Sequence, residues 1–477
     1  MTDRWPRTRT FARTALHTRT PAWALSRRAV LLAAVAGVAG SGALAGCRVI
    51  DDGVGAENLS GALNKEPAPG RPRTIEMYNQ WGGRAGQAWV AMAQLYEEIQ
   101  DEVAVRITYA PPTADTQVRL LTSIAAESPP DVAFVLPEHY PQLTGLGVVT
   151  DLGPYLAADG LGAADFNPAI WKAMNLTGTV YSMPAMVDPN FPLFYNRAVL
   201  ADAGLDPDAP PVTLDELTAM SEAILQQQGG RITRIGTMPW NYYGYSNSLY
   251  TIGFAFGASF VSADNDRVTT ENPEVVTALE WICDFAESMG GAGNVAVTQP
   301  GFSLPVLGTG NVGLMPMTAG DANNLSENSD IDLGSAPFPY AEGAGQPGSA
   351  TWIGGWNMFI PSEAGDPDAA WDFIRWVTTS PEGTTENFEQ MSNIPGLAQA
   401  PALEELEADP VLGVFAEVLR DAQNVRPTIP VAGVLSQQLD IYVGQAVFGQ
   451  LTAQQAMQRV SDITNAAWDE FRETNGE

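Results

Sequence analysis

Hydrophobic and polar positions switch repeatedly between strand-like and helix-like spacing along the chain. The segments that carry these signals near the start are a strand at 74–78, a helix through Trp89, Met92, Leu95 and Ile99, a strand at 103–110, a helix at 115–128 and a strand at 131–137. Strands and helices that alternate in this way are typical of α/β proteins. We therefore expect an α/β fold with central, mainly parallel sheets.

Three further helices are predicted by the residues at which they begin. Thr213–Glu216 and Thr452–Gln455 have the spacing of a capping box, in which two side chains satisfy free backbone amides at a helix start. The second box should open the last helix, which runs to about Phe471. Asp366–Pro367 places a proline at a first helical position and predicts a third helix.

The first 46 residues have the pattern of an export signal. Ala29 to Ala45 is a run of seventeen uncharged residues, mostly Ala, Gly and Val, preceded by seven arginines. The run is shorter than the roughly 20 apolar residues of a spanning helix. Arg27–Arg28 looks like a twin-arginine signal, and Leu44–Cys47 resembles a lipobox, so we expect cleavage before Cys47 and a lipid on its sulfur. A plain signal anchor and export by the general route are the alternatives.

Residues 47–72 contain few large apolar side chains and end in Pro and Gly, which predicts a flexible tether. Ordered structure should begin near Thr74. Roughly 400 residues then remain, which is too many for one hydrophobic core and indicates at least two domains. The expected location is the outer face of the cell membrane, with the lipid on Cys47 as anchor.

The composition argues against nucleic acid and anionic membrane surfaces as partners. Beyond residue 46 the chain has 17 Lys and Arg against 54 Asp and Glu, a formal charge of about −37. Such a surface repels nucleic acid and anionic lipid headgroups. Apart from Cys47 the only cysteine there is Cys283, so no intramolecular disulfide is expected, and its helical neighbours predict a buried, inert thiol.

Catalytic signatures are nearly absent. His139 is the single histidine beyond residue 46, which argues against a histidine-based zinc site or a Ser-His-Asp triad. The two G-x-G-x-x-G matches, 308–313 and 343–348, do not open predicted helices and are interpreted as turns. No enzyme activity, metal or cofactor is expected. Acid pairs for glycoside hydrolysis remain open, since the many carboxylates make any one pair uninformative.

Aromatic and amide side chains gather beside glycines at three places, 79–87, 238–248 and 351–359. Aromatic faces stack on the C–H faces of sugar rings, and amides and carboxylates bind hydroxyl groups. The clusters therefore favour a neutral polyol as ligand. The alternative is that these aromatic residues belong to the core.

From about Thr74 onward the chain resembles the family-1 extracellular solute-binding proteins of ABC importers, the maltose-binding-protein-like group. The segments that carry the resemblance are SPPDVAFV followed by LGVVTDLGPYL, the Tyr-x-x-Pro to Glu-Leu run at 181–217, the Gly-Gly-Trp strand and helix beginning at Trp352, and NIPGL at 393–397.

The resemblance implies a periplasmic-binding-protein-like fold with two α/β lobes, three crossing segments and a ligand cleft between the lobes. The crossings are expected near Ala185–Asn190, Trp352–Trp356 and Glu382–Ser392. Lobe one is expected at 73–185 and 356–386, and lobe two at 190–352 and 390–477.

The same resemblance implies the ligand-binding residues, which are Trp81, Glu138, Asp188, Trp240, Tyr243, Asn247, Trp352, Trp356 and Asn393. For Glu138 and Asp188 a solvated loop carboxylate is the alternative. Arg84 is the only arginine close to a predicted contact. Where maltose binders carry a stacking Trp, this chain has LMPMTAGDA, which weakens a claim to maltose itself.

The implied mechanism is binding without chemistry, in which the lobes close on a sugar and deliver it to a membrane permease powered by a separate ATPase. The partners are thus a small solute, the importer's permease subunits and the membrane through Cys47, with the protein a monomer. Two alternatives remain, the same fold binding a polyamine or glycerophosphodiester, and a secreted glycan-degrading enzyme.

Overall fold

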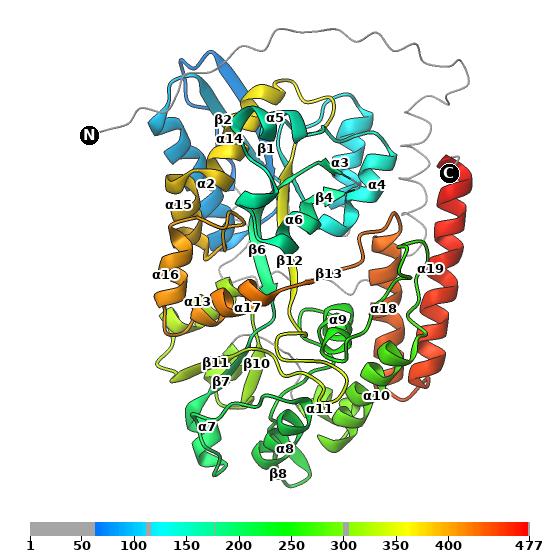
Figure 1. The fold of residues 1–477 in the computed structure, drawn as a ribbon. Coiled ribbons are helices and arrows are strands. Elements are labelled where there is room, and N and C mark those ends of the chain that lie inside the picture. The colour runs from blue at the N-terminus through cyan, green and yellow to red at the C-terminus, as the bar shows by residue number, and fades with distance from the viewer. Residues whose placement is uncertain (1–62, 111–115, 177, 299–304, 476–477) are drawn as a thin grey trace.

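The structure is a computed structural model that describes residues 63–110, 116–176, 178–298 and 305–475 (Figure 1). The predicted export signal, the lipid site Cys47 and most of the predicted tether lie outside the described residues. Within the described ranges, no helix combines the length and the apolar character needed to cross a membrane.

Lobe one forms the upper half of the molecule in Figure 1. Its elements before the first crossing are β1 (Arg73–Asn79), α2 (Gly83–Ile99), β2 (Val103–Tyr109), α3 (Thr116–Ala125), β3 (Ala133–Val135), the 3-10 turn η2 (Pro137–His139), α4 (Tyr140–Gly145), α5 (Gly153–Asp159), η3 (Ala163–Asp165), α6 (Pro168–Met174), β4 (Asn175–Leu176) and β5 (Thr179–Val180). The chain returns to it as α14 (Pro367–Thr379) and α15 (Pro381–Met391).

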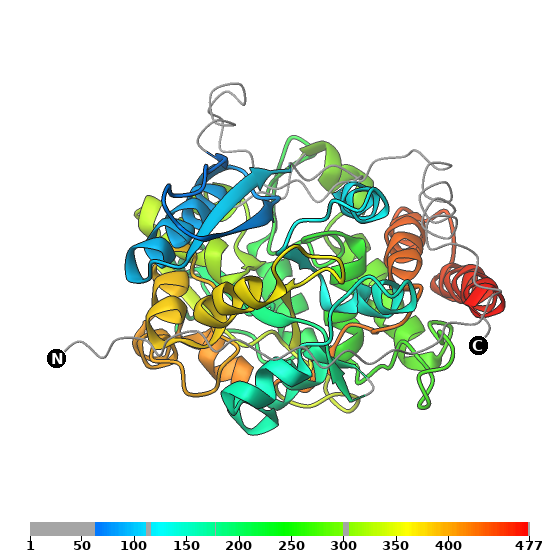
Figure 2. The same cartoon turned by 90° about the horizontal axis from the view of Figure 1, so that it is seen from above.

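Lobe two forms the lower half, and its last helix, α19, extends upward beside lobe one (Figure 1). Its elements are β7 (Leu193–Asn196), α7 (Arg197–Asp202), α8 (Leu214–Ile224), β8 (Gln226–Gln228), β9 (Arg231–Arg234), α9 (Tyr245–Ala255), α10 (Pro273–Ser288), α11 (Ala292–Thr298), α12 (Pro305–Gly308), β10 (Leu314–Pro316), α13 (Ala319–Asn328), β11 (Leu333–Ala336), α18 (Ala432–Val447) and α19 (Ala453–Asn475). Seen from above, β1 and β2 lie on the opposite side of the molecule from α18 and α19 (Figure 2).

Two long strands, β6 (Met183–Asn190) and β12 (Trp352–Phe359), run side by side through the centre (Figure 1). They are antiparallel, with Trp352 opposite Asn190 and Met358 opposite Met183. The close approach explains the glycines within TWIGGW. A Cβ on Gly355 would lie 1.8 Å from the carbonyl oxygen of Met186, and the residue has a φ of +107°, which L side chains rarely adopt.

The expectation of mainly parallel sheets is wrong for most of the described strand pairs. β1 pairs with β2 in parallel, and β12 pairs with the short β13 (Asn424–Val425) in parallel. β12 is antiparallel to β3 and to β6, and β7 is antiparallel to β10 and to β11. The physical reason is that β6 carries the chain out of lobe one and β12 carries it back, so the two strands run in opposite directions. The alternation of strands and helices along the sequence does not reveal this pattern.

The buried side chains form two large clusters and a smaller third one. The first joins residues between 75 and 187 to residues between 353 and 422, and it also takes in Phe194, Leu307 and side chains between 315 and 325, which belong to lobe-two elements. The second joins residues between 191 and 352 to residues between 429 and 468. Most of the buried residues therefore change cluster between Val187 and Phe191, and again between Trp352 and Ile353.

The segment Glu382–Ser392, expected to be the third crossing, forms most of α15. This helix packs on α14 and α2, and Asn387 donates to the Ala185 carbonyl at 2.7 Å. Two more helices, α16 (Ala402–Ala408) and α17 (Gly413–Asp421), follow before β13. In Figure 1 the chain runs from α17 on the left through β13 near the centre to α18 on the right.

The helix starts are confirmed. Thr213 and Glu216 form both hydrogen bonds of the predicted capping box, and Thr452 with Gln455 forms the second. Asp366 caps α14 with a proline in its first turn. The first G-x-G-x-x-G match begins at the last residue of α12, and neither match opens a helix, as predicted.

The described structure reaches back to Leu63, about ten residues before the expected start near Thr74. Leu63 is 2% exposed, and Lys65 forms an antiparallel bridge with Ile107 of β2. We call residues 63–71 the strap. Their composition predicted a flexible tether because one buried Leu and one buried Lys among Pro, Gly and Glu are a weak signal.

Candidate functional site

Trp352 lies where β12 passes from one lobe to the other, and a cation covers its ring. The guanidinium carbon of Arg426 lies 4.7 Å from the ring centroid, and Nη1 of Arg426 lies 2.7 Å from Oε1 of Glu138. The two charged side chains are 14% and 5% exposed. The indole N–H of Trp352 donates to Thr251 at 3.0 Å. These contacts tie η2 of lobe one to β12 and α9 at the junction. Glu138 is therefore a buried, paired carboxylate and not a solvated loop residue.

Tyr243 holds a second part of the junction. Its ring stacks on Phe191 with centroids 4.9 Å apart, and Phe191 meets the Trp352 ring edge-on at 5.5 Å. Asn247, one turn into α9, donates to the Tyr243 carbonyl at 2.7 Å. Its own Oδ1 is buried without a hydrogen-bond partner among the described residues, so an acceptor is available there.

Two carboxylates face the same group. The Tyr243 hydroxyl donates to Asp321, near the N-terminus of α13, and burial raises the pKa of the Asp321 carboxyl. Burial, followed by the nearby charge of Asp321, raises the pKa of Asp188 to about 7, while Arg426 opposes the shift. A carboxyl with this pKa can donate or accept a hydrogen bond near neutral pH.

Trp81 and Trp356 meet on the lobe-one side. The Trp81 ring lies edge-on to Trp356 of β12 at 5.7 Å and edge-on to Phe134 at 4.5 Å. Trp81 is 8% exposed, and Trp356 is half-buried. The structure thus brings together seven of the nine predicted site residues in two neighbouring groups along β12: Glu138, Asp188, Tyr243, Asn247 and Trp352 in one, and Trp81 and Trp356 in the other.

The remaining two predicted residues lie elsewhere. Trp240 is buried in the lobe-two core beside Phe285, as expected for an aromatic core residue. Asn393 donates to Asn387 at 2.8 Å, and that amide in turn supports the β6 backbone. Neither contacts the group around Trp352 through an interaction between described residues.

Arg426 and Asp321 were missed by the sequence analysis. Arg84 was taken as the only arginine near a predicted contact, but Arg426 touches two of the predicted residues, Glu138 and Trp352. The available signal was a rare cation followed by a proline in a strongly acidic chain. No local pattern could show that Asp321 and Asp188, more than a hundred residues apart, interact.

One exposed ion pair joins the lobes outside the buried group. Arg84, in the first turn of α2, lies 2.9 Å from Glu327 near the end of α13. Hydrogen bonding to Arg84 lowers the pKa of Glu327. Because both side chains are about half exposed, the pair should contribute little to the free energy of unfolding, and this contribution should fall as the salt concentration rises.

Replacing Arg84 with Gln should therefore lower the free energy of unfolding by at most about 1 kcal/mol at low salt, since an exposed pair contributes about 0–1 kcal/mol. Urea denaturation at low and at high ionic strength measures this effect. Arg420→Gln is the matched control because Arg420 pairs with Glu407 between α17 and α16, at similar exposure, and does not join the lobes. A loss of several kcal/mol that does not depend on salt would contradict the description of the Arg84–Glu327 pair as exposed and weak.

The thiol of Cys283 and the imidazole of His139 show no sign of a reactive role. Cys283 is half-buried rather than fully buried, and burial raises its pKa to about 11, so the thiol stays protonated at neutral pH. Burial lowers the pKa of His139. In the part of the chain that the structure describes, no group of three or more His, Cys, Asp or Glu side chains is placed to hold a metal ion.

Comparison with known proteins agrees with this architecture. A family model described as bacterial extracellular solute-binding protein matches residues 91–414. The maltotriose-binding protein of Pyrococcus abyssi is 22% identical over 366 residues, covering 73% of this chain and 72% of that protein. A probable ABC transporter-binding protein of Deinococcus radiodurans is 26% identical, covering 74% and 83%.

Solved structures share the fold. CpMnBP1 with mannobiose bound superposes with a TM-score of 0.72 at 23% identity, covering 83% of this chain and all of that one. The sugar-binding protein MalE of Xanthomonas citri gives 0.72 at 18% identity, covering 85% and 99%. The two-lobed architecture predicted from the sequence is confirmed, and the chain belongs to the bacterial extracellular solute-binding proteins.

Proposed function

We propose that the protein is the receptor of an ABC importer and binds a sugar, an oligosaccharide, between its two lobes. The observation that carries this proposal is the junction along β12, where the partly exposed rings of Trp356 and Tyr243, an amide with a free acceptor and the carboxyl of Asp188 lie beside the fully buried Trp352. Rings of this kind stack on sugar C–H faces, and the polar groups bind hydroxyls. Relatives that bind maltotriose and mannobiose support the ligand class.

The mechanism is capture by closure, with no chemical step. A ligand that binds the closed form better shifts the population toward it, and the importer's permease then receives the solute. In this proposal lobe one is 63–190 with 353–425 and lobe two is 191–352 with 426–477, so the third crossing moves from 382–392 to β13. The boundaries follow the change in buried clusters and the packing of α15.

The proposal extends to the cell surface. The Leu44–Cys47 motif supports an exported protein held by a lipid on Cys47 at the outer face of the membrane, working as a monomer. Metabolic labelling with a fatty acid tests the anchor. Label in the natural chain and none in Cys47→Ser is the expected result, and equal labelling of both would contradict it.

Ligand identity is tested by thermal denaturation of residues 48–477 in the presence of mannobiose, maltotriose, other oligosaccharides and spermidine. A ligand at 100 times its dissociation constant adds about 2.7 kcal/mol to the free energy of unfolding, which shifts the midpoint visibly. We expect a shift with an oligosaccharide that is recovered intact. Recovery of a cleaved sugar would contradict binding without chemistry.

A polyamine is the second candidate, and one observation favours it. Asp188 and Asp321 interact electrostatically at the junction beside the stacked ring of Tyr243, in a strongly acidic chain. Two carboxylates beside an aromatic ring are suited to a dication. A shift with spermidine and with none of the sugars would keep the fold and overturn the sugar proposal.

A further inference from the structure

The strap is built into lobe one. The Lys65 amide donates to the Ile107 carbonyl at 3.0 Å, and the Ile107 amide donates back at 2.9 Å, so the strap adds a short antiparallel bridge to β2. The Asn64 side chain accepts from the Tyr109 amide at 2.8 Å. These bonds place the strap along the far half of β2, where this strand approaches the end of β1.

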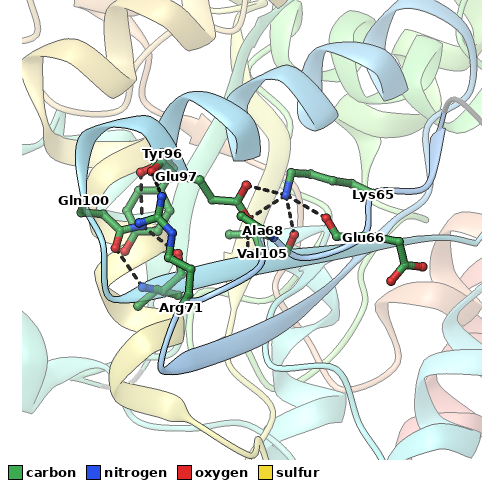
Figure 3. A network of polar contacts seen from close by, with 9 residues as sticks. Lys65, Glu66, Ala68, Arg71, Tyr96, Glu97, Gln100 and Val105 are labelled. Carbon is green, nitrogen blue, oxygen red and sulfur yellow. Dashed lines mark hydrogen bonds and ion pairs between the residues drawn. The ribbon is translucent and has the colours of Figure 1, made fainter.

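A buried ion pair locks the strap in place (Figure 3). Nζ of Lys65 lies 2.7 Å from both carboxylate oxygens of Glu97 on α2 and donates to the Val105 carbonyl at 3.0 Å. Glu97 also accepts from the backbone amides of Val105 and Ala68, at 2.8 and 3.3 Å. The side chains of the pair are 7% and 8% exposed. Removing one partner would leave a charge buried without compensation, so the strap is held tightly.

The upstream end of the strap supports the loop that carries Trp81. A Cβ on Gly86, in the first turn of α2, would lie 2.7 Å from Cδ2 of Leu63 and 2.2 Å from the Trp81 carbonyl oxygen. Leu63 and the Trp81 backbone therefore both lie against Gly86. The Asn79 side chain ties the same loop together, since it donates to the Gly86 carbonyl at 3.3 Å and accepts from the Trp81 amide at 3.1 Å.

We propose that the strap is a positioning element of the ligand site, in which Lys65 fixes the strap and Leu63 supports the loop that presents Trp81 to Trp356. This inference rests on the proposed function, because it assumes that the Trp81 face contributes to ligand binding. It assigns a role to residues that otherwise only link the N-terminal segment to the first strand. Leu63 acts through Gly86 and Trp81 and does not touch the ligand.

The test uses Leu63→Ala and Lys65→Met in the chain from residue 48. The matched control is Leu156→Ala, because Leu156 of α5 is similarly buried, at 3%, and lies in the core cluster that contains Trp81 but outside the strap and the Trp81 loop. The first readout is amide hydrogen exchange of residues 79–86 in the ligand-free protein. We expect exchange there to rise at least about tenfold in both strap variants and to stay unchanged in the control.

The second readout is the affinity for mannobiose and maltotriose, measured well below the unfolding midpoint of every variant. We expect the dissociation constant of the sugar that binds to rise about tenfold in the strap variants, and this loss to disappear when Trp81 is already Ala. Unchanged exchange at 79–86 would overturn the positioning role, and so would faster exchange with unchanged affinity. If neither sugar binds the natural chain, the sugar proposal fails for these two ligands, while the exchange experiment still decides whether the strap positions the loop.

Discussion

Replacing Arg426 with Met should lower the free energy of unfolding by about 3–5 kcal/mol, the cost of removing one partner from a buried ion pair. The change leaves Glu138, 5% exposed, with no cation beside it and uncovers the Trp352 ring. The loss should be nearly independent of salt because the pair is shielded from solvent. Urea denaturation at two ionic strengths measures both effects.

Arg420→Met provides the control for this experiment. Arg420 lies 3.1 Å from Glu407, but both side chains are more than 60% exposed, so its loss should cost about 0–1 kcal/mol and should depend on salt. If the two variants lose equal stability, Glu138 and Arg426 do not hold the junction as described. A smaller loss in Glu138→Gln, which keeps a hydrogen-bonding side chain, would agree with the buried pair.

The second large effect is that the free energy of unfolding should depend on pH because of the titration of Asp188. Its pKa is raised to about 7 in the folded protein, against an ordinary value of 3.8, because the charged form is buried near Asp321. A raised carboxyl pKa stabilises the folded state fully at low pH, and this contribution is lost as pH rises from about 4 to about 7. Between pH 5 and pH 8 the loss through this one group should be about 3 kcal/mol.

Asp188→Asn removes this contribution because the amide stays neutral throughout. The natural chain should lose about 3 kcal/mol of stability through this group between pH 5 and pH 8, and the variant should not. The free energy of unfolding of the variant minus that of the natural chain should therefore be about 3 kcal/mol larger at pH 8 than at pH 5. Asp101→Asn serves as the control, since that side chain is fully exposed. A constant difference between Asp188→Asn and the natural chain across this range would show that Asp188 is ionised already at pH 5.

Local signals predicted local structure well. The capping residues Thr213 and Asp366 fix where α8 and α14 begin, because their bonds reach only three residues ahead. The Gly354–Gly355 pair was noted only for the tryptophans on either side of it, and the structure shows that the β6 backbone passes closely there. The site could be predicted in part because Trp352, Trp356 and Asp188 lie on these two crossing strands.

The rest depends on contacts between distant segments. The pairing of Glu138 with Arg426 joins residues nearly 300 positions apart, and no spacing rule encodes it. The strap was taken for a tether because its stability comes from one buried pair, Lys65 with Glu97, and not from a run of apolar residues. Trp240 lay within the same sequence cluster as Tyr243, yet only the packing of α10 decides that Trp240 belongs to the core.

The strap also determines where a mechanical load enters the molecule. Tension along the N-terminal segment is borne by the Leu63 contact, by Lys65 in its buried pair and by the two backbone bonds to Ile107, all within lobe one. The crossing strands β6 and β12 lie outside this force path. A protein held on its N-terminal side is thus loaded first through lobe one, to which lobe two is tied by the Glu138–Arg426 and Arg84–Glu327 pairs.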